Sequence, residues 1–182
     1  MRALEIAAIA LFFALLALSF PGISPGHIPL AALGGWLLAD LLSGLVHWAL
    51  DSFGSVCTPV VGPALIRPFR EHHADPAAMT GHGFAEVNGA SCLGSLPLLA
   101  SCFFVDGFPH ALLAFTSAGI LLTNQCHKWA HAVSPPAFVR LLQKARLVLN
   151  AAEHAKHHKP PYDSHFCTAN GWLNRPLDWL LK

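Results

Sequence analysis

Two groups of histidines at helical spacing are the residues in this chain most suited to chemistry. His127 and His131 are four residues apart at the end of an apolar run. His154, His157 and His158 repeat the pattern with spacings of three and four. Residues three or four apart lie on one face of an α-helix, about 6 Å from each other. Imidazoles at that separation can bind one metal ion, so both groups are candidate ligands.

An earlier apolar segment carries ionisable side chains on one helix face. His47 and Asp51 are four residues apart, and Asp40 lies seven residues before His47. Ionisable residues inside an apolar span are costly and usually face a polar interior. His47 is therefore a candidate ligand. Asp51 could bind a metal, orient an imidazole, or act as a capping or ion-pairing acid at a helix end.

Three more candidate histidines follow in a polar stretch. His72 and His73 are adjacent, so they point in different directions on a helix and could serve different ions. His82 lies four residues before Glu86, and the two share a face if this segment is helical. Each of these histidines alone could be a solvated loop residue, but their accumulation favours a metal site.

The composition is typical of a membrane protein. The chain has 182 residues, of which 54% are hydrophobic and 12% charged, against about 25% charged in a soluble domain. Its mean hydropathy is +0.49. The net charge of +1 gives no indication of a nucleic-acid partner. The 12 histidines outnumber the 11 lysines and arginines, and the 5 cysteines form no C-x-x-C pair, so we expect free thiols.

Four apolar segments predict four membrane-spanning helices, at about 4–20, 28–50, 90–105 and 109–131. A span needs about 20 residues to cross about 30 Å of hydrocarbon, so the first and third are short. The first could instead be a signal peptide, but no convincing cleavage site follows it and four spans explain the charges better. We predict an all-α integral membrane protein with one domain over residues 1–182.

The charges predict the orientation of these spans. The outer loops would be about 21–27 and 106–108, and every lysine and arginine falls on the other side. The positive-inside rule makes that side cytoplasmic, together with both termini, the loop 51–89 and the tail 132–182. The predicted architecture is thus four transmembrane helices with a cytoplasmic, histidine-rich cap that holds two metal ions.

This orientation also separates the histidines. His27 and His110 lie at the outer ends of their spans, too far from the cytoplasmic side because a spanning helix is about 30 Å long. The segment 137–149 is amphipathic and basic, which favours a helix on the inner membrane surface over a plain packed helix. It would return the chain so that the two histidine groups meet. His165 has no periodic partner and is predicted to be structural.

The number of imidazoles suggests more than one metal ion. The candidate ligands are His47, His72, His73, His82, His127, His131, His154, His157 and His158. Two ions with about four to six ligands each would use them, but imidazole suits zinc, copper and iron alike. Zinc sites have about three or four ligands, whereas so much nitrogen at a membrane face favours a di-iron centre that activates dioxygen.

These patterns resemble the histidine boxes of membrane di-iron desaturases and hydroxylases. More specifically, the chain resembles the plasmanylethanolamine desaturase family of membrane lipid desaturases, with its plant relative that desaturates an acyl chain of plastid phosphatidylglycerol. The matching pieces are Asp40-x-x-Ser-Gly-x-x-His-Trp-x-x-Asp51, Phe69-Arg-Glu-His-His-x-Asp-Pro76, His82-x-Phe-x-Glu-x-Asn-Gly89, Asn124-Gln-x-His-Lys-Trp-Ala-His131, His154-x-x-His157-His158 and Asn170-Gly-Trp-Leu-Asn174. Gly83 replaces an expected acid and His165 an expected aromatic residue, which leaves the exact substrate open.

The resemblance implies an oxidoreductase that removes two hydrogens from a lipid chain. It would use two iron ions, O2 as co-substrate, and an external electron donor that is cytochrome b5-like or ferredoxin-like. In the plasmanylethanolamine branch the product is the vinyl ether bond of a plasmalogen. We expect Asp51, Glu71 and Glu86 to support the ligands. From the position of the charges alone, we expect Arg67, Arg70, Lys128, Lys156 or Lys159 to contact the phosphate of the lipid.

Other functions fit parts of the pattern. An acyl-chain desaturase or a hydroxylase would begin with the same hydrogen abstraction, so the sequence does not separate them from an ether-lipid desaturase. A metal transporter would need polar ligands near the middle of the bilayer, where Asp40 alone is a candidate. A zinc hydrolase would leave most of the histidines unexplained.

Overall fold

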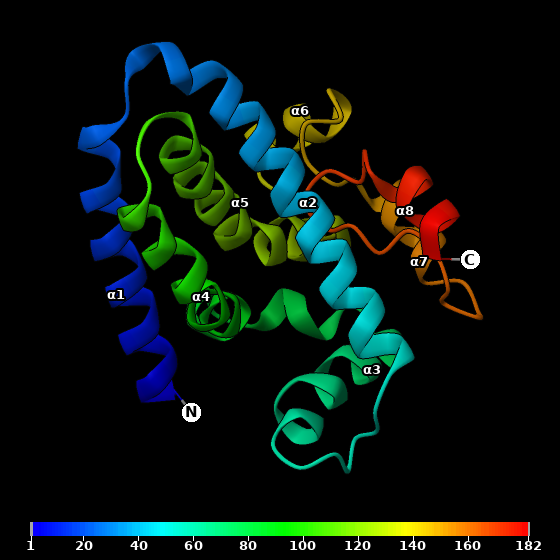
Figure 1. Cartoon of the computed structure of the whole chain (residues 1–182). Helices are drawn as coiled ribbons and strands as arrows, with labels where there is room; N and C mark the ends of the chain where they lie inside the picture. The colour runs from blue at the N-terminus through cyan, green and yellow to red at the C-terminus, as the bar shows by residue number, and fades with distance from the viewer. Residues whose placement is uncertain (1, 182) are drawn as a thin grey trace. The chain divides into compact units, whose positions relative to one another are not determined.

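The computed structural model describes residues 2–181, and every regular element in them is a helix (Figure 1). This confirms the predicted all-α class. The long helices are α1 (Arg2–Ser19), α2 (Ile28–Ser52), α4 (Phe84–Ser101) and α5 (Gly107–His131). The short ones are α3 (Arg67–Ala74), α6 (Ala137–Lys144), α7 (Ala151–His157) and α8 (Asn174–Leu181), with tighter or wider turns at η1 (Phe20–Gly22), η2 (Pro25–His27), η3 (Gly62–Ile66), η4 (Ala78–Gly81) and η5 (Cys102–Phe104).

Three helical stretches are long and apolar enough to cross a membrane. They are Ala3–Gly22, Pro25–Ser52 and Phe84–Phe104, and they contain the first three predicted spans except for Val105. The fourth predicted span falls on α5, which has 25 residues but is less apolar than the other three. The third span begins earlier than predicted because Glu86 accepts a hydrogen bond from the backbone N–H of Gly83 and so caps the start of α4.

The chain forms two compact units, and α2 and α5 contribute residues to both. The first unit contains the chain up to Asp40 together with Gly83–Gln125. In it α1 packs along α4, and the core is a cluster of buried apolar side chains: Phe12, Leu16, Cys92, Leu99, Cys102 and Leu121. Much of the apolar surface faces outward, since 22%, 28% and 39% of the three spanning windows are buried. Such exposure of apolar helices suits a lipid environment.

A small residue lets two helices of the first unit approach closely. A Cβ atom added at Gly35 of α2 would lie 2.7 Å from the backbone of Phe115 in α5. Real Cβ atoms do not approach backbone atoms so closely, so only glycine fits this crossing. Small residues at such contacts are typical of helix packing in membranes. Within the same unit, His110 of α5 contacts the end of α1 and the start of η5. Its two ring nitrogens lie 2.7 and 2.8 Å from the carbonyl oxygens of Cys102 and Ser19, respectively.

The second unit contains Leu41–His82 and the chain from Cys126 onward. Its C-terminal segment packs against the end of α2. Gly44 faces Cys167 so closely that an added Cβ would lie 2.7 Å from the sulfur, and the N–H of Thr168 donates to Ser43 Oγ at 3.1 Å. Asn174 holds the same segment by accepting from the N–H of Cys167 at 2.9 Å. These contacts fix the segment that follows α7.

The helix predicted over 137–149 is shorter in the structure. It ends at Lys144, and the chain then turns with Arg146 at a positive φ of 57°. Asn150 starts α7 by accepting a hydrogen bond from the N–H of Glu153. The turn therefore replaces the last residues of the predicted helix. Phe138 and Leu141 on α6 are 60% and 68% exposed, which agrees with an apolar face available to the membrane surface.

We expect Gly35→Ala to lower the stability of the purified protein by about 1–3 kcal/mol, because the added methyl group meets backbone that cannot rotate away. Gly94→Ala is the matched control, since a Cβ at Gly94 meets nothing within 4 Å. Thermal unfolding in detergent measures both. An unchanged melting temperature for Gly35→Ala would contradict the close helix crossing.

Candidate metal centre

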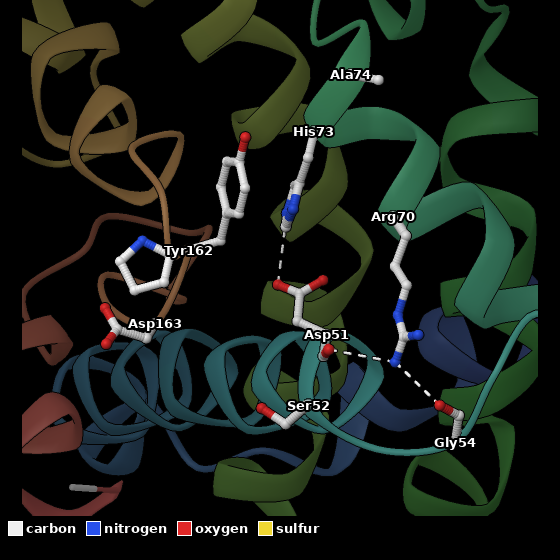
Figure 2. Close-up of a pocket in the computed structure, with 9 residues that line it drawn as sticks. Asp51, Ser52, Gly54, Arg70, His73, Ala74, Tyr162 and Asp163 are labelled. Atoms are coloured by element: carbon white, nitrogen blue, oxygen red, sulfur yellow. Dashed lines mark hydrogen bonds and ion pairs between the residues drawn. The ribbon is translucent and has the colours of Figure 1, made fainter.

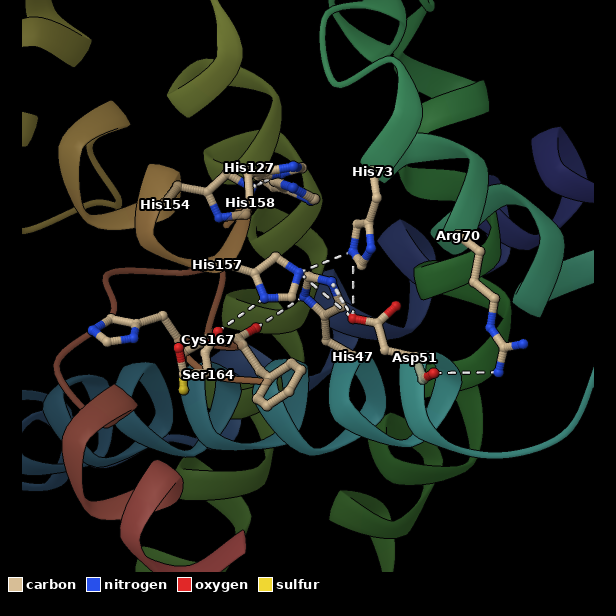
Figure 3. A network of polar contacts seen from close by, with 12 residues as sticks. His47, Asp51, Arg70, His73, His127, His154, His157, His158, Ser164 and Cys167 are labelled. Carbon is tan, nitrogen blue, oxygen red and sulfur yellow. Dashed lines mark hydrogen bonds and ion pairs between the residues drawn. The ribbon is translucent and has the colours of Figure 1, made fainter. Parts of the chain in front are cut away.

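Three imidazoles from three helices gather around one carboxylate oxygen of Asp51 in the second unit (Figure 3). His47 and Asp51 lie on the last turns of α2, His73 on α3 and His157 on α7. The Nε2 atoms of these histidines lie 3.3, 3.5 and 3.5 Å from Asp51 Oδ2, respectively. One ligand atom from each residue lies within 4.8 Å of the others. We call this group the carboxylate cluster.

Hydrogen bonds to the backbone determine which ring nitrogen carries the proton in His47 and in His157. His47 Nδ1 lies 3.0 Å from the carbonyl oxygen of Phe166, and His157 Nδ1 lies 2.9 Å from that of Ser164. A carbonyl oxygen can only accept, so each Nδ1 donates its hydrogen and each neutral ring leaves a lone pair on Nε2. Both lone pairs face the carboxylate of Asp51.

This arrangement fits a metal cation. The two Nε2 lone pairs and the carboxylate are all acceptors, and within the cluster only His73 can bring a hydrogen between them. His73 Nε2 is also 3.0 Å from His157 Nε2. All four side chains are at least largely buried, so water does not screen the repulsion between acceptors. A divalent cation would replace it with attraction, and the backbone carbonyls would hold the imidazoles in the ligating tautomer.

Five more histidines form a second group in the same unit. They come from α3, the end of α5, and the segment that contains α7: His72, His127, His131, His154 and His158. One nitrogen from each lies within 4.8 Å of the others. Two pairs of Nε2 atoms face each other, His127 with His131 at 3.3 Å and His154 with His158 at 3.0 Å. We call this group the five-histidine cluster.

Four imidazoles of the two clusters, all outside the membrane spans, have a lowered pKa. Burial, then the nearby imidazoles, with His131 first among them, lowers the pKa of His72 and of His158 from the ordinary 6.5 to about 3 in each case. Burial also lowers the pKa of His154 and His157. At neutral pH these rings are therefore unprotonated, which is the form that binds metals.

Helix geometry explains how the sequence serves both clusters. The i, i+4 pairs remain together, with His127 and His131 in the five-histidine cluster. Adjacent residues differ by about 100° around a helix axis, so His72 and His73 belong to different clusters, as do His157 and His158. The two clusters adjoin, because the ring centroids of His157 and His158 are 5.4 Å apart.

The structure does not bring every predicted residue to the clusters. His82 is exposed, and it precedes the start of α4 rather than sharing a helix with Glu86. Glu71 is exposed, and Glu86 caps α4. Neither cluster includes His82, Glu71 or Glu86, so their metal roles stay predictions. The structure supports the structural role predicted for His165, whose N–H and Nδ1 contact the carboxylate of Asp178 at 2.8 and 3.2 Å.

Two residues, Arg70 and Tyr162, support the site through contacts that the sequence did not indicate. Arg70 Nη2 donates to the carbonyl oxygens of Asp51, Phe53 and Gly54 at 3.2, 3.1 and 3.2 Å. It thus holds the C-terminal end of α2, where these carbonyls lack helical partners. Tyr162 stacks on His73, with ring centroids 4.5 Å apart. Carbonyl contacts of this kind depend on the path of the chain, which spacing alone does not reveal.

The basic residues predicted to meet a phosphate are partly engaged within the protein. Besides Arg70, Lys128 donates to the carbonyl oxygen of His82, and Lys156 pairs with Glu153 at 2.8 Å. Arg67 and Lys159 are exposed. A role of any of them in binding the lipid phosphate stays a prediction.

Comparisons with known proteins identify a family of relatives. Residues 36–181 match the lipid desaturase domain. The chain is 45% identical to plasmanylethanolamine desaturase of Myxococcus xanthus, over 97% of this chain and 67% of the relative. It is also 45% identical to plasmanylethanolamine desaturase 1 of Mus musculus, over 84% of this chain and 62% of the relative. The chain thus spans about two thirds of the length of these two relatives.

A plant relative is less similar. Fatty acid desaturase 4, chloroplastic, of Arabidopsis thaliana is 37% identical over 82% of this chain and 47% of the relative. No solved structure matches the chain.

We expect the purified, metal-loaded protein to bind about two ions per chain, one at each cluster. Replacing both His73 and His157 by alanine should remove the ion of the carboxylate cluster and leave the other. Replacing both His131 and His154 by alanine should remove the ion of the five-histidine cluster and leave that of the carboxylate cluster. Elemental analysis of detergent-purified protein measures the metal content, with His27→Ala as a control outside both clusters. Two ions in either double variant would contradict the assignment.

A separate substitution tests the three roles open to Asp51. If its carboxylate binds or balances the metal charge, Asp51→Asn should weaken metal binding at the carboxylate cluster by at least about tenfold, since the shape is kept but the charge is lost. A competition titration with a chelator measures the affinity. Wild-type affinity in Asp51→Asn would show that Asp51 only ends the helix.

Proposed function

Because the chain belongs to the lipid desaturase family, we propose that it is a membrane lipid desaturase that forms the vinyl ether bond of a plasmalogen from plasmanylethanolamine. The observation that carries this proposal is the 45% identity to two plasmanylethanolamine desaturases. The identity to the plant fatty acid desaturase is lower, at 37%. We assign the activity to one domain over residues 1–182.

The metal is proposed to be iron, with two ions per chain. Two adjoining clusters, one with three imidazoles and a carboxylate and one with five imidazoles, offer nitrogen-rich sites that suit a redox metal. When bound, iron would supply from O2 the strong oxidant that breaks an unactivated C–H bond, which amino-acid side chains cannot provide. The residues Asp51, Ser164 and Phe166 orient the imidazoles through the contacts described above.

The protein also controls access to the site. His47, His154 and His157 are at most 1% exposed, so the inner side of both clusters is closed to solvent. His72 and His158 are only partly buried, which leaves a more open side. Exclusion of water would strengthen the electrostatic attraction between Asp51 and a bound metal ion, and it would limit side reactions of an oxidant. The geometry thus suits oxidation of a substrate that enters from one direction.

The proposed orientation places the site and both termini in the cytoplasm. The basis is the charge distribution, because every lysine and arginine falls outside the two predicted outer loops. Electrons would come from a separate protein that is cytochrome b5-like or ferredoxin-like. Such a donor would approach from the cytoplasmic side, where the segments carrying α3 and α7 lie in this orientation.

The second candidate is a desaturase of a phospholipid acyl chain. It is favoured by the similarity to the chloroplastic fatty acid desaturase of Arabidopsis thaliana. Both reactions remove two hydrogens from neighbouring carbons and need the same metals. The nature of the product separates them, because a vinyl ether is cleaved by mild acid to an aldehyde and an acyl double bond is not.

The test is to reconstitute iron-loaded protein in vesicles that contain plasmanylethanolamine, O2 and a reducing donor system. We expect acid-labile vinyl ether lipid to form only when O2 and the donor are present. His157→Ala should abolish product because the carboxylate cluster loses a ligand, whereas His27→Ala should leave it intact. Mass spectrometry measures the lipid. An acyl double bond without any vinyl ether would favour the second candidate.

A further inference from the structure

The proposed reaction requires the lipid headgroup to lie close to the bond that is oxidised. The carbon that becomes the first vinyl carbon is bound to the ether oxygen on glycerol, and the phosphate is bound to the same glycerol. About six covalent bonds separate that carbon from the phosphorus, which corresponds to about 7 Å when extended. A headgroup site must therefore open directly beside the metal ligands.

One cavity of the second unit meets this requirement (Figure 2). It has a volume of about 750 Å³, and its walls include Asp51 and His73 of the carboxylate cluster together with Arg70, Tyr162 and Asp163. A second cavity of about 320 Å³ borders the Asn170–Asn174 motif, but none of its described lining residues belongs to either cluster. The larger cavity is therefore the candidate for the headgroup.

The charges around the larger cavity match a zwitterion. Asp163 is exposed, and no cation pairs with its carboxylate within the described part of the chain. Arg70 lies away from it, on the other side of Asp51 and His73 (Figure 2). Its Nη2 holds the end of α2, while Nε has no hydrogen-bond partner. A phosphoethanolamine group likewise carries a negative phosphate and a positive ammonium a few bonds apart.

The backbone before Asp163 is held in an unusual conformation. Tyr162 has a φ of 65°, in the left-handed region that bulky residues rarely adopt. Its ring stacks on His73 with planes 23° apart, and its N–H donates to the carbonyl oxygen of Lys159 at 2.9 Å. Such strain persists where the surroundings fix it and is frequent at functional sites. The stacking keeps Asp163 at the same cavity as the ligand His73.

We propose that Asp163 binds the ammonium group of the ethanolamine headgroup and sets the headgroup preference of the enzyme. The phosphate lies toward Arg70, and the ether-linked chain leads to the metal ligands. A primary ammonium donates hydrogen bonds to a carboxylate and also carries a positive charge. A trimethylammonium has the charge but no N–H to donate, and the terminal glycerol of a phosphoglycerol headgroup has hydroxyl donors but no positive charge. This inference rests on the proposed function, because it names the substrate group that the same site recognises.

The first experiment compares three ether lipids that differ only in the headgroup: ethanolamine, choline and glycerol. For the ethanolamine lipid, Asp163→Asn should raise KM about tenfold or more, the effect of losing one charged hydrogen bond, with kcat and iron content near wild type. Asp163→Lys should shift the preference toward the phosphoglycerol lipid, whose headgroup is anionic. Asp106→Asn, at an exposed acid of the first unit, is the matched control. Wild-type KM and headgroup preference in Asp163→Asn would overturn the inference.

A binding experiment separates this inference from the proposed function. Soluble glycerophosphoethanolamine and glycerophosphoglycerol are titrated into iron-loaded protein in detergent, followed by ligand-observed NMR. Wild type and Asp106→Asn should bind the ethanolamine compound more tightly, and Asp163→Asn should lose the difference. If that result holds but no headgroup supports vinyl ether formation, the proposed function fails and the headgroup site stands. No preference in the wild type would overturn the headgroup site, even if vinyl ether forms.

Discussion

The convergence of unprotonated acceptors on one carboxylate is the constraint on which the second unit depends. His47 and His157 each direct a lone pair at Asp51 Oδ2 because their other ring nitrogens donate to backbone carbonyls. Buried acceptors that face each other without a hydrogen are unfavourable. A bound cation reverses the sign of that interaction. The free energy of metal binding therefore also contributes to the stability of the folded unit.

The ligand-bearing segments are arranged so that a few short stretches of chain supply ligands to both clusters. Each of α3 and the segment after Asn150 carries a pair of adjacent histidines, and each pair divides between the clusters. The angular step of a helix makes this division automatic. The i, i+4 spacing then adds a second ligand to the same cluster, as His131 does beside His127. Local helix geometry thus supplies most of the site, and tertiary packing only has to bring four short segments together.

This division explains how much of the protein could be predicted from its sequence. The apolar runs predicted the long helices, and the spacing of His127 and His131 correctly placed them on one face. The end of α6 could not be predicted, because the amphipathic pattern continues past Lys144 while Arg146 turns at positive φ. His82 shows the same limitation. Its spacing to Glu86 suggested a shared helix face, but Glu86 caps the start of α4 and His82 remains outside the helix.

The contacts that orient the imidazoles could not be predicted from the sequence, for a different reason. A carbonyl oxygen is present at every residue, so nothing distinguishes Ser164 or Phe166 until the chain path is known. The carbonyl contacts of Arg70 could not be predicted for the same reason. Its charge suggested a phosphate contact, which stays a prediction, and gave no sign that its Nη2 donates to three carbonyls at and after the end of α2. Spacing identifies ligands, while their orientation depends on tertiary contacts.

The location of the clusters within the helices bears on which bond the enzyme can oxidise. His47 and Asp51 lie in the last two turns of α2, and His127 and His131 in the last turns of α5. Ligands at the ends of apolar helices lie near the level of the headgroups rather than at the middle of a bilayer. A bond beside glycerol occupies that level, whereas a bond halfway along a chain would have to bend back to reach it. This placement of the ligands is compatible with the proposed oxidation next to the headgroup, which would give a vinyl ether product.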